Sequence, residues 1–514
     1  NCRLISIDQR MYRTNDGWER VFECPPLSDR QIIQILENYV GPTYDLRRWS
    51  EFCSGSPRIA HAIGQNLRHN SEDILLSPST VSVWEKFIYG NNSAKDESKI
   101  FVLKHLALFE RFGYEEPVQE EARFIHKTIN RDDPNISWAK FQIVIEELKS
   151  QGILKGKTTL HITPKALHVY LWIEFWKHGR GMCENLQEMP DSLMIWFGGM
   201  FSYAKSSEIA LKEIEKLFRA NGPFYKTDIL HPKACMLLNE LSEAFPDQTL
   251  QCIENTLMLK EREELLEFKK GRQYIVFALE KMAWRPNYFS RAATVLLHLA
   301  HADNSTHANN AKGTFAALFH LTPGVAPTAA PPEERLSFLE ASLSSDSFPI
   351  RQIGLIGYEE ALSIPAHAKT RVVGSEYQGL ERTLSAWVPK TWEEYKTPFY
   401  KAWGDLFKNT RQWEVIERSK VNSILIHKGE YLLKEKGYEW LEPNILKTFQ
   451  DLIDDEATDK KYFIETLTSI QRHPNNISQN ALSAIRNLED QITGVSFASR
   501  IKRWVNFANH NDRS

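Results

Sequence analysis

The sequence predicts a mainly α-helical protein that carries one small β-hairpin. Apolar residues recur at helical spacing, and from about Cys183 to the end no strand signal of comparable strength interrupts them. Only the segment from Gly152 to Ile162 alternates apolar and polar residues, around a Lys-Gly-Lys turn, as a two-stranded hairpin does. Proline breakers stand at intervals of a helix or a helix pair: Pro232, Pro246, Pro286 and Pro349.

The composition is that of a globular chain. With 514 residues, 42% hydrophobic and 25% charged, it is long enough for roughly three to four domains. A net charge of -3 provides no global basic field for nucleic acid. No apolar run reaches the ~18 to 20 residues of a membrane helix, and the first residues do not form a signal peptide, so no membrane partner is expected. The cysteines are scattered, which predicts free thiols in a reducing, cytoplasmic compartment: Cys2, Cys24, Cys53, Cys183, Cys235 and Cys252.

The first 76 residues predict an entry strand and a small helical unit. Residues 21–24 are strand-like, and Ser28 with Asp29 can cap a first helix. A second helix precedes Trp49 and Phe52, and a third runs from Pro57 to about Leu67. Because the chain begins without Met in a strand-like segment, we expect it to be a fragment of a longer protein.

The turn from Gly55 to Arg58 carries candidate ligand-binding residues. Gly55 lets the backbone approach a ligand, Pro57 fixes φ in the first helical turn, and Arg58 offers a guanidinium to a phosphate. The alternative is that Gly-Ser-Pro is a helix cap and nothing more.

Residues 77–180 predict a winged-helix domain. Helices are expected over 97–109 and 120–129 and from Ser137 onward, and the hairpin follows them. The third helix, which would read DNA, carries two Lys against two Glu, and a near-neutral helix is a poor reader of DNA. Lys155, Lys157 and Lys165 near the wing keep nucleic acid as an alternative partner.

The hairpin also contains a near match to a phosphate-binding loop. Gly152, Gly156, Lys157 and Thr158 are one intervening residue short of that pattern. The segment also lies between a helix and a strand, whereas a phosphate loop joins a buried strand to a helix. No nucleophile with a partnering His can be assembled from spacing either, so we expect no catalytic residues in this chain.

Two short motifs resemble those of AAA+ and STAND ATPases. Residues 26–29, Pro-Leu-Ser-Asp, and residues 55–57, Gly-Ser-Pro, stand at the separation found across the helical lid of those proteins. A winged helix after the lid is the STAND order. Residues 271–281, 292–300 and 309–319 resemble a helical segment of large bacterial STAND ATPases of the antiviral-defence kind. The resemblance implies a lid over 1–76, a winged helix over 77–180, and an α-solenoid of degenerate HEAT-like helix pairs over 181–365 and 366–514.

The resemblance also implies a function. The chain would be the regulatory and ligand-sensing part of a STAND NTPase, whose solenoid binds a trigger, a foreign or phage protein, and couples it to nucleotide-dependent homo-oligomerisation. ATP or ADP, with Mg²⁺, would be held mainly by a core that this chain lacks. Gly55, Pro57 and Arg58 would face the nucleotide, and Arg58 would sense the γ-phosphate. His161 is the candidate for the diphosphate-sensing histidine, but the expected Asp does not follow it, which leaves an ordinary strand residue as the alternative.

Other interpretations remain open. The chain could be a winged-helix nucleic-acid-binding regulator with a helical interaction scaffold, or a passive scaffold. His298 and His301, with His307 beyond, have a spacing that can hold zinc, but only Asp303 is near to complete a site, so no metal is expected. Tryptophans of the last third are expected to be packing anchors rather than a binding cage: Trp387, Trp392, Trp403, Trp413 and Trp440.

Overall fold

The computed structural model describes residues 25–41, 45–69, 75, 78–89, 96–177, 186–219, 222, 224, 231–303, 310–325, 328–364, 377–378, 381–382 and 384–494. Over these residues the protein is mainly α, with 23 helices, 70% helical content and one small three-stranded antiparallel sheet. The strand expected over 21–24 lies outside the described residues. None of the described helices is both long and apolar enough to cross a bilayer.

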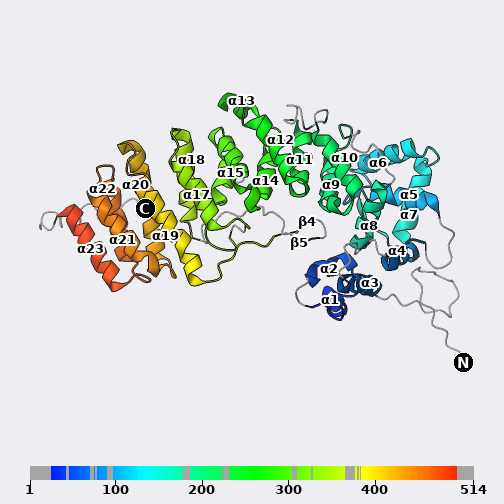
Figure 1. Ribbon diagram of the computed structural model, residues 1–514, viewed down its shortest axis with the longest axis horizontal. Helices are drawn as coiled ribbons and strands as arrows, with labels where there is room; N and C mark the ends of the chain where they lie inside the picture. Colours follow the sequence, from blue (N-terminus) through cyan, green and yellow to red (C-terminus); the bar gives the residue numbers. More distant parts are fainter. Residues whose placement is uncertain are drawn as a thin grey trace. The chain divides into compact units, whose positions relative to one another are not determined.

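The chain divides into two compact units (Figure 1). Unit 1 is residues 1–245 with 377–381, and unit 2 is residues 246–376 with 382–514. The predicted boundaries at 76, 180 and 365 are finer than this division and stay a prediction.

Unit 1 opens with three short helices, α1 (Asp29–Glu37), α2 (Leu46–Cys53) and α3 (Pro57–Arg68). Ser28 and Gln31 cap each other's backbone N–H groups in a capping box, so α1 begins where the sequence predicts. Ser56 is the N-cap of α3, and Pro57 takes its first position. The helices bury one apolar face each, and the predicted start of α3 is confirmed.

The next part of unit 1 combines helices with the small sheet. It contains α4 (Pro78–Tyr89), α5 (Glu97–Leu106), α6 (Gln119–Asp132), α7 (Trp138–Ser150) and α8 (Lys165–Trp176), with strands β1 (Phe112–Gly113), β2 (Leu154–Gly156) and β3 (Thr159–Ile162). The hairpin β2–β3 is confirmed, in a register that pairs Leu154 with Ile162. The sheet order is β1-β3-β2. The sequence did not predict β1, because two residues carry no periodic signal.

Unit 1 ends with α9 (Asp191–Met200), the 3₁₀ helix η2 (Phe201–Ser206), α10 (Glu208–Phe218) and α11 (Pro232–Ala244). Aromatic rings of α8, α9 and η2 form its core. Trp172, Trp176 and Phe201 lie with ring centroids 5.8 to 5.9 Å apart, and all three are buried.

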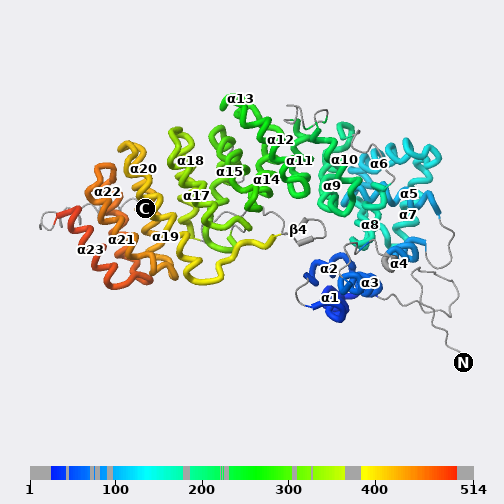
Figure 2. Tube along the Cα trace, in the orientation of Figure 1, coloured from blue at the N-terminus to red at the C-terminus, as the bar shows by residue number. Residues whose placement is uncertain are grey.

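Unit 2 is a succession of helices, and Figure 2 shows its longer helices side by side. They are α12 (Pro246–Leu257), α13 (Arg262–Glu267), α14 (Arg272–Ala283), α15 (Pro286–His301), α16 (Ala311–Ala317), α17 (Pro332–Leu343), α18 (Phe348–Ala361), α19 (Trp392–Lys408), α20 (Val415–Lys434), the 3₁₀ helix η5 (Glu439–Leu441), α21 (Glu442–Ile453), α22 (Lys460–Arg472) and α23 (Gln479–Thr493). Pro246, Pro286 and Pro349 each stand in the first turn of a helix, as the breaker pattern predicts. The sequence did not predict the short ladder of β4 (Tyr377–Gln378) and β5 (Glu381–Arg382).

Candidate functional site

The turn between α2 and α3 brings the two short sequence motifs into contact. The N–H of Leu27 donates to the carbonyl of Gly55 at 2.9 Å. Gly55 has φ +77°, and a Cβ there would lie 2.6 Å from Pro26 Cβ and 2.8 Å from the Leu27 carbonyl oxygen. Only glycine fits this position, because L residues rarely adopt that φ and the space is filled. Gly55 therefore packs against the segment at Pro26 and Leu27 of the same protein. The sequence did not reveal this packing role.

Pro57 and Arg58 lie on the exposed side of the same turn. Ser56 Oγ accepts the N–H of Ile59, the N–H of Ala60 bonds to the Ser56 carbonyl, and Pro57 has no N–H, so the N–H of Arg58 is the one left without an intrahelical partner in the first turn of α3. This N–H and the Arg58 guanidinium together make the start of α3 favourable for an anion. The turn can therefore contribute to phosphate binding, although it cannot enclose a nucleotide.

Two further cations lie beside this turn. Lys165, at the start of α8, donates its N–H to Ser54 Oγ at 3.4 Å, and its Nζ lies 5.2 Å from the centroid of the Phe52 ring. The Arg48 guanidinium lies 5.7 Å from the same centroid. Burial lowers the pKa of Arg48, and the negative groups near it, Tyr203, Asp45 and Glu51 when ionised, oppose that shift. The turn is thus bordered by positive charge from α2, α3 and α8.

His161 lies in β3 opposite Lys155 and is exposed. Partial burial lowers its pKa, and the positive charges of Arg111 and Lys155 lower it further. No hydrogen bond or ion pair of the described residues joins His161 to the turn at Gly55.

The helix that would read DNA in a winged-helix protein, α7, pairs its two lysines with other side chains of the protein. Lys140 Nζ donates to Ser98 Oγ at 2.8 Å, and Lys149 Nζ lies 3.1 Å from Glu146 Oε1. The exposed side of α7 presents Ile143, which is 61% exposed, with Glu146 and Glu147. Glu146 pairs with Lys149 and Glu147 with Lys99, so this side carries no excess positive charge that would attract phosphate.

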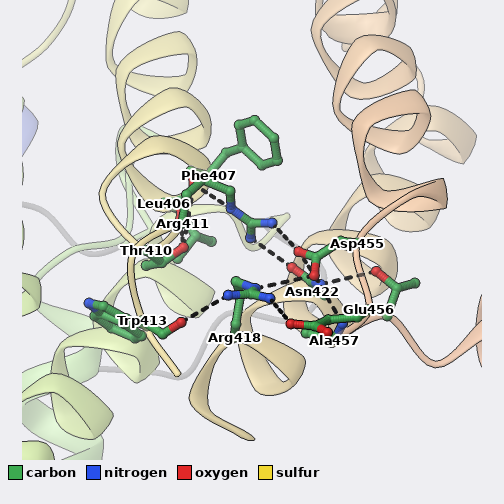
Figure 3. Close-up of polar contacts among 11 residues, drawn as sticks. Leu406, Phe407, Thr410, Arg411, Trp413, Arg418, Asn422, Asp455, Glu456 and Ala457 are labelled. Atoms are coloured by element: carbon green, nitrogen blue, oxygen red, sulfur yellow. Dashed lines mark hydrogen bonds and ion pairs between the residues drawn. The ribbon is translucent and has the colours of Figure 1, made fainter. Parts of the chain in front are cut away.

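Figure 3 shows a cluster of charged and polar residues around Asp455, which follows α21. Its Oδ2 accepts from Arg411 Nη1 at 2.6 Å and from Asn422 Nδ2 at 3.1 Å. Its Oδ1 accepts from Arg418 Nε at 3.2 Å and from the Ala457 N–H at 2.9 Å. Burial favours the neutral acid, but these four donors prevail and lower the pKa of Asp455.

Both guanidinium groups of this cluster donate further hydrogen bonds within the protein. Arg411 also donates to Asn422 Oδ1 at 2.7 Å and to the Phe407 carbonyl at 3.0 Å. Arg418 also donates to the Trp413 carbonyl at 3.0 Å and lies 3.2 Å from Glu456 Oε1. We therefore assign the cluster a structural role that ties α19 and α20 to the connection after α21. It joins residues far apart in sequence, so no local pattern could reveal it.

His298 of α15 is explained by packing. His298 Nε2 lies 3.1 Å from the Leu257 carbonyl oxygen and 3.2 Å from that of Lys260, so it is a hydrogen-bond donor to both. His307 lies outside the described residues. Within the described part of the chain, no group of three or more His, Cys, Asp and Glu side chains could hold a metal ion.

The tryptophans of the last third do not share one role. Trp403 and Trp413 are buried, and Trp403 Nε1 donates to Thr448 Oγ1 at 2.9 Å, which confirms them as packing anchors. Trp392 is 56% exposed and stacks on Tyr395 with 5.1 Å between ring centroids. Trp387 and Trp440 are half-buried.

Comparisons of the chain with protein-family models, with curated proteins and with solved structures found no match. Assignment of a class to the chain therefore depends on its own residues and their geometry.

Proposed function

We propose that the chain is the regulatory and ligand-sensing part of a STAND-type NTPase. The observation that carries this proposal is the turn at Gly55, where two motifs of the AAA+-type lid touch each other and where Arg58 opens the next helix with its side chain exposed. In this proposal α1 to α3 form the lid.

The arrangement of α5 to β3 supports a winged-helix domain after the lid. The element order α5, β1, α6, α7, β2, β3 places one short strand between the first two helices, and that strand pairs with β3 in the sheet order β1-β3-β2. A three-helix unit followed by a hairpin wing has this layout. The start of α8 adds Lys165 beside the lid turn.

The helices of unit 2 support the solenoid part of the proposal. Successive helices of unit 2 pack on near neighbours along the chain, as in α-solenoids, whose extended surfaces suit protein partners. The proposed partner is a protein trigger, which in the antiviral setting is a foreign protein.

The proposed mechanism is a population shift. In the resting state the lid and winged helix hold ADP against a nucleotide-binding core, and the trigger favours an open state that exchanges ADP for ATP with Mg²⁺ and assembles into a homo-oligomer. To reverse a strong bias, the trigger must favour the open state by about 5.5 kcal/mol. This chain supplies the sensing residue Arg58 and the surface for the trigger.

The test uses two arginines of the same helix. In the protein that joins this chain to its nucleotide-binding core, Arg58→Ala should abolish ATP-dependent assembly measured by light scattering after size-exclusion chromatography. Arg68, the last residue of α3 and also exposed, is the matched control, and Arg68→Ala should assemble normally. Unchanged assembly of Arg58→Ala would refute the sensing role.

A second function has one observation in its favour. Lys155 and Lys157 are exposed at the hairpin turn, where a wing contacts the DNA backbone. If the winged helix binds DNA, binding will weaken steeply with salt, and Lys155→Ala with Lys157→Ala will reduce that salt dependence. Fluorescence anisotropy with a labelled duplex measures both. Binding that does not respond to these substitutions would exclude the hairpin as the contact.

A further inference from the structure

The junctions between successive helix pairs of unit 2 differ in chemistry. Upstream, α15 and the α16 region meet α17 through four phenylalanines, Phe289, Phe315, Phe319 and Phe338. Their ring centroids lie 4.9 to 6.4 Å apart. Gly357 of α18 allows close contact there, since a Cβ at that position would lie 2.4 Å from Leu339 Cδ2. We call this the aromatic junction.

Downstream, α19 and α20 are held firmly to α21 and α22. Gly429 of α20 lies against Phe449 of α21, where an added Cβ would be 2.6 Å from the ring. Phe449 packs edge-on against Phe463 of α22 with 5.1 Å between centroids. The Asp455 cluster adds charged contacts to this apolar packing.

Between these two, charged and polar groups join α17–α18 to α19–α20. Arg351 of α18 forms a two-pronged ion pair with Glu417 of α20, at 2.6 and 2.9 Å. Lys401 of α19 lies 2.9 Å from Glu340 of α17. Lys428 Nζ donates to Ser363 Oγ at 2.8 Å, and Lys420 donates to Gln352: these contacts define the polar junction.

The polar junction also contains groups whose burial is unfavourable. Tyr358 is fully buried, and its hydroxyl has no hydrogen-bond partner among the residues that the structure describes. Burial raises the pKa of Tyr358, and the carboxylates of Asp405 and Glu340 raise it further. Burial lowers the pKa of the Lys428 ammonium. Separating the helices would return these groups to water, and their hydration would offset part of the free energy needed to break the ion pairs.

The junctions also differ in what their opening exposes. The side chains of Arg351 and Glu417 are 17% and 12% exposed, so this ion pair is largely buried. Opening the polar junction would hydrate both charges and return the desolvation cost of burying them, whereas opening the other two junctions would expose apolar rings to water. Of the three junctions, the polar one therefore needs the least free energy to open.

We propose that the polar junction is a hinge at which α19–α23 move as a block relative to α12–α18. This inference goes beyond the proposed function, because it requires neither nucleotide nor trigger. It also names the place where a ligand that binds unit 2 would change the shape of that unit.

Spin-label distances test the hinge. One pair, Ala341→Cys in α17 with Asp451→Cys in α21, spans the polar junction, and both positions are exposed. The control pair, Thr294→Cys in α15 with Ala341→Cys, spans the aromatic junction, and Thr294 is exposed. Cys2, Cys24 and Cys183 are replaced by serine in both, and mass spectrometry checks that the buried Cys53, Cys235 and Cys252 remain unlabelled.

Double electron–electron resonance is then recorded from about 0.1 M to about 1 M NaCl, which shortens the screening length about threefold. The distribution across the polar junction should broaden or shift in high salt, and Glu417→Gln should produce the same change in low salt. The control pair should not change.

Two results would overturn the hinge. One is a distribution across the polar junction that responds neither to salt nor to Glu417→Gln. The other is an equal change in both pairs, which would mean general loosening of unit 2 rather than motion at one junction.

Discussion

Replacement of Asp455 by alanine should destabilise the second half of unit 2. The substitution removes the acceptor of two guanidinium groups and of the Asn422 amide (Figure 3). The Asp455 side chain is 10% exposed, and those of Arg411 and Arg418 are 27% and 16% exposed. Removing one partner of a buried ion pair costs about 3–5 kcal/mol. Because solvent reaches part of both arginines, we expect about 2–4 kcal/mol.

Hydrogen exchange read peptide by peptide is the appropriate assay, because it reports the opening of α20 to α22 separately from unit 1. A loss of about 2–4 kcal/mol corresponds to exchange about 30- to 900-fold faster for amides that exchange through this opening. Asp455→Asn, which keeps the volume and one acceptor oxygen, should give a smaller effect than Asp455→Ala.

Glu456 provides the matched control. It also pairs with Arg418, at 3.2 Å, but its side chain is 74% exposed. An exposed pair contributes about 0–1 kcal/mol, so Glu456→Gln should change exchange by less than about fivefold. If Asp455→Ala changed exchange no more than Glu456→Gln does, the cluster would not hold these helices together.

Three further predictions concern pH and glycine. Because the folded pKa of Asp455 is below its unfolded value of about 3.9, its contribution to stability is present above that pH and is lost as pH falls through the folded pKa. The urea midpoint of the unchanged protein should therefore fall in acid, and that of Asp455→Asn should fall less steeply. Gly429→Ala should lower the thermal midpoint, because the added methyl group meets Phe449. Gly404→Ala should instead stabilise α19 by about 0.5–1 kcal/mol, because a Cβ there has nothing within 4 Å. Equal effects of the two substitutions would refute the packing explanation. Gly55→Ala should speed hydrogen exchange in α2 and α3 by at least about fivefold, because the strained φ and the clash together cost more than about 1 kcal/mol. Unchanged exchange would show that the turn tolerates a side chain.

Local chemistry made much of the helical framework predictable. Ser28 and Ser56 mark helix starts because their hydroxyls accept N–H groups that a helix leaves free, and the structure has both caps. The hairpin over 154–162 follows from alternation around a turn. The strand β1 was missed because its formation depends on pairing with β3, which lies far along the chain.

The candidate site was predictable only in part. Gly55 was singled out from its position before a helix, but its actual neighbours, Pro26 and Leu27, come from another segment. Lys165 and Arg48 were not assigned to the same place, because nothing in their spacing shows that both approach Phe52.

The sequence by itself determined where helices begin, which faces they bury and where the hairpin turns, because capping, periodicity and turn chemistry act over a few residues. The tertiary structure alone decided that Gly55 packs against Pro26, that Lys140 of α7 bonds to Ser98, and that charges join α18 to α20 while aromatic rings join α15 to α17. These outcomes depend on which distant side chains share a contact, and the free energy of such a contact is set by burial and by partners that no local pattern contains.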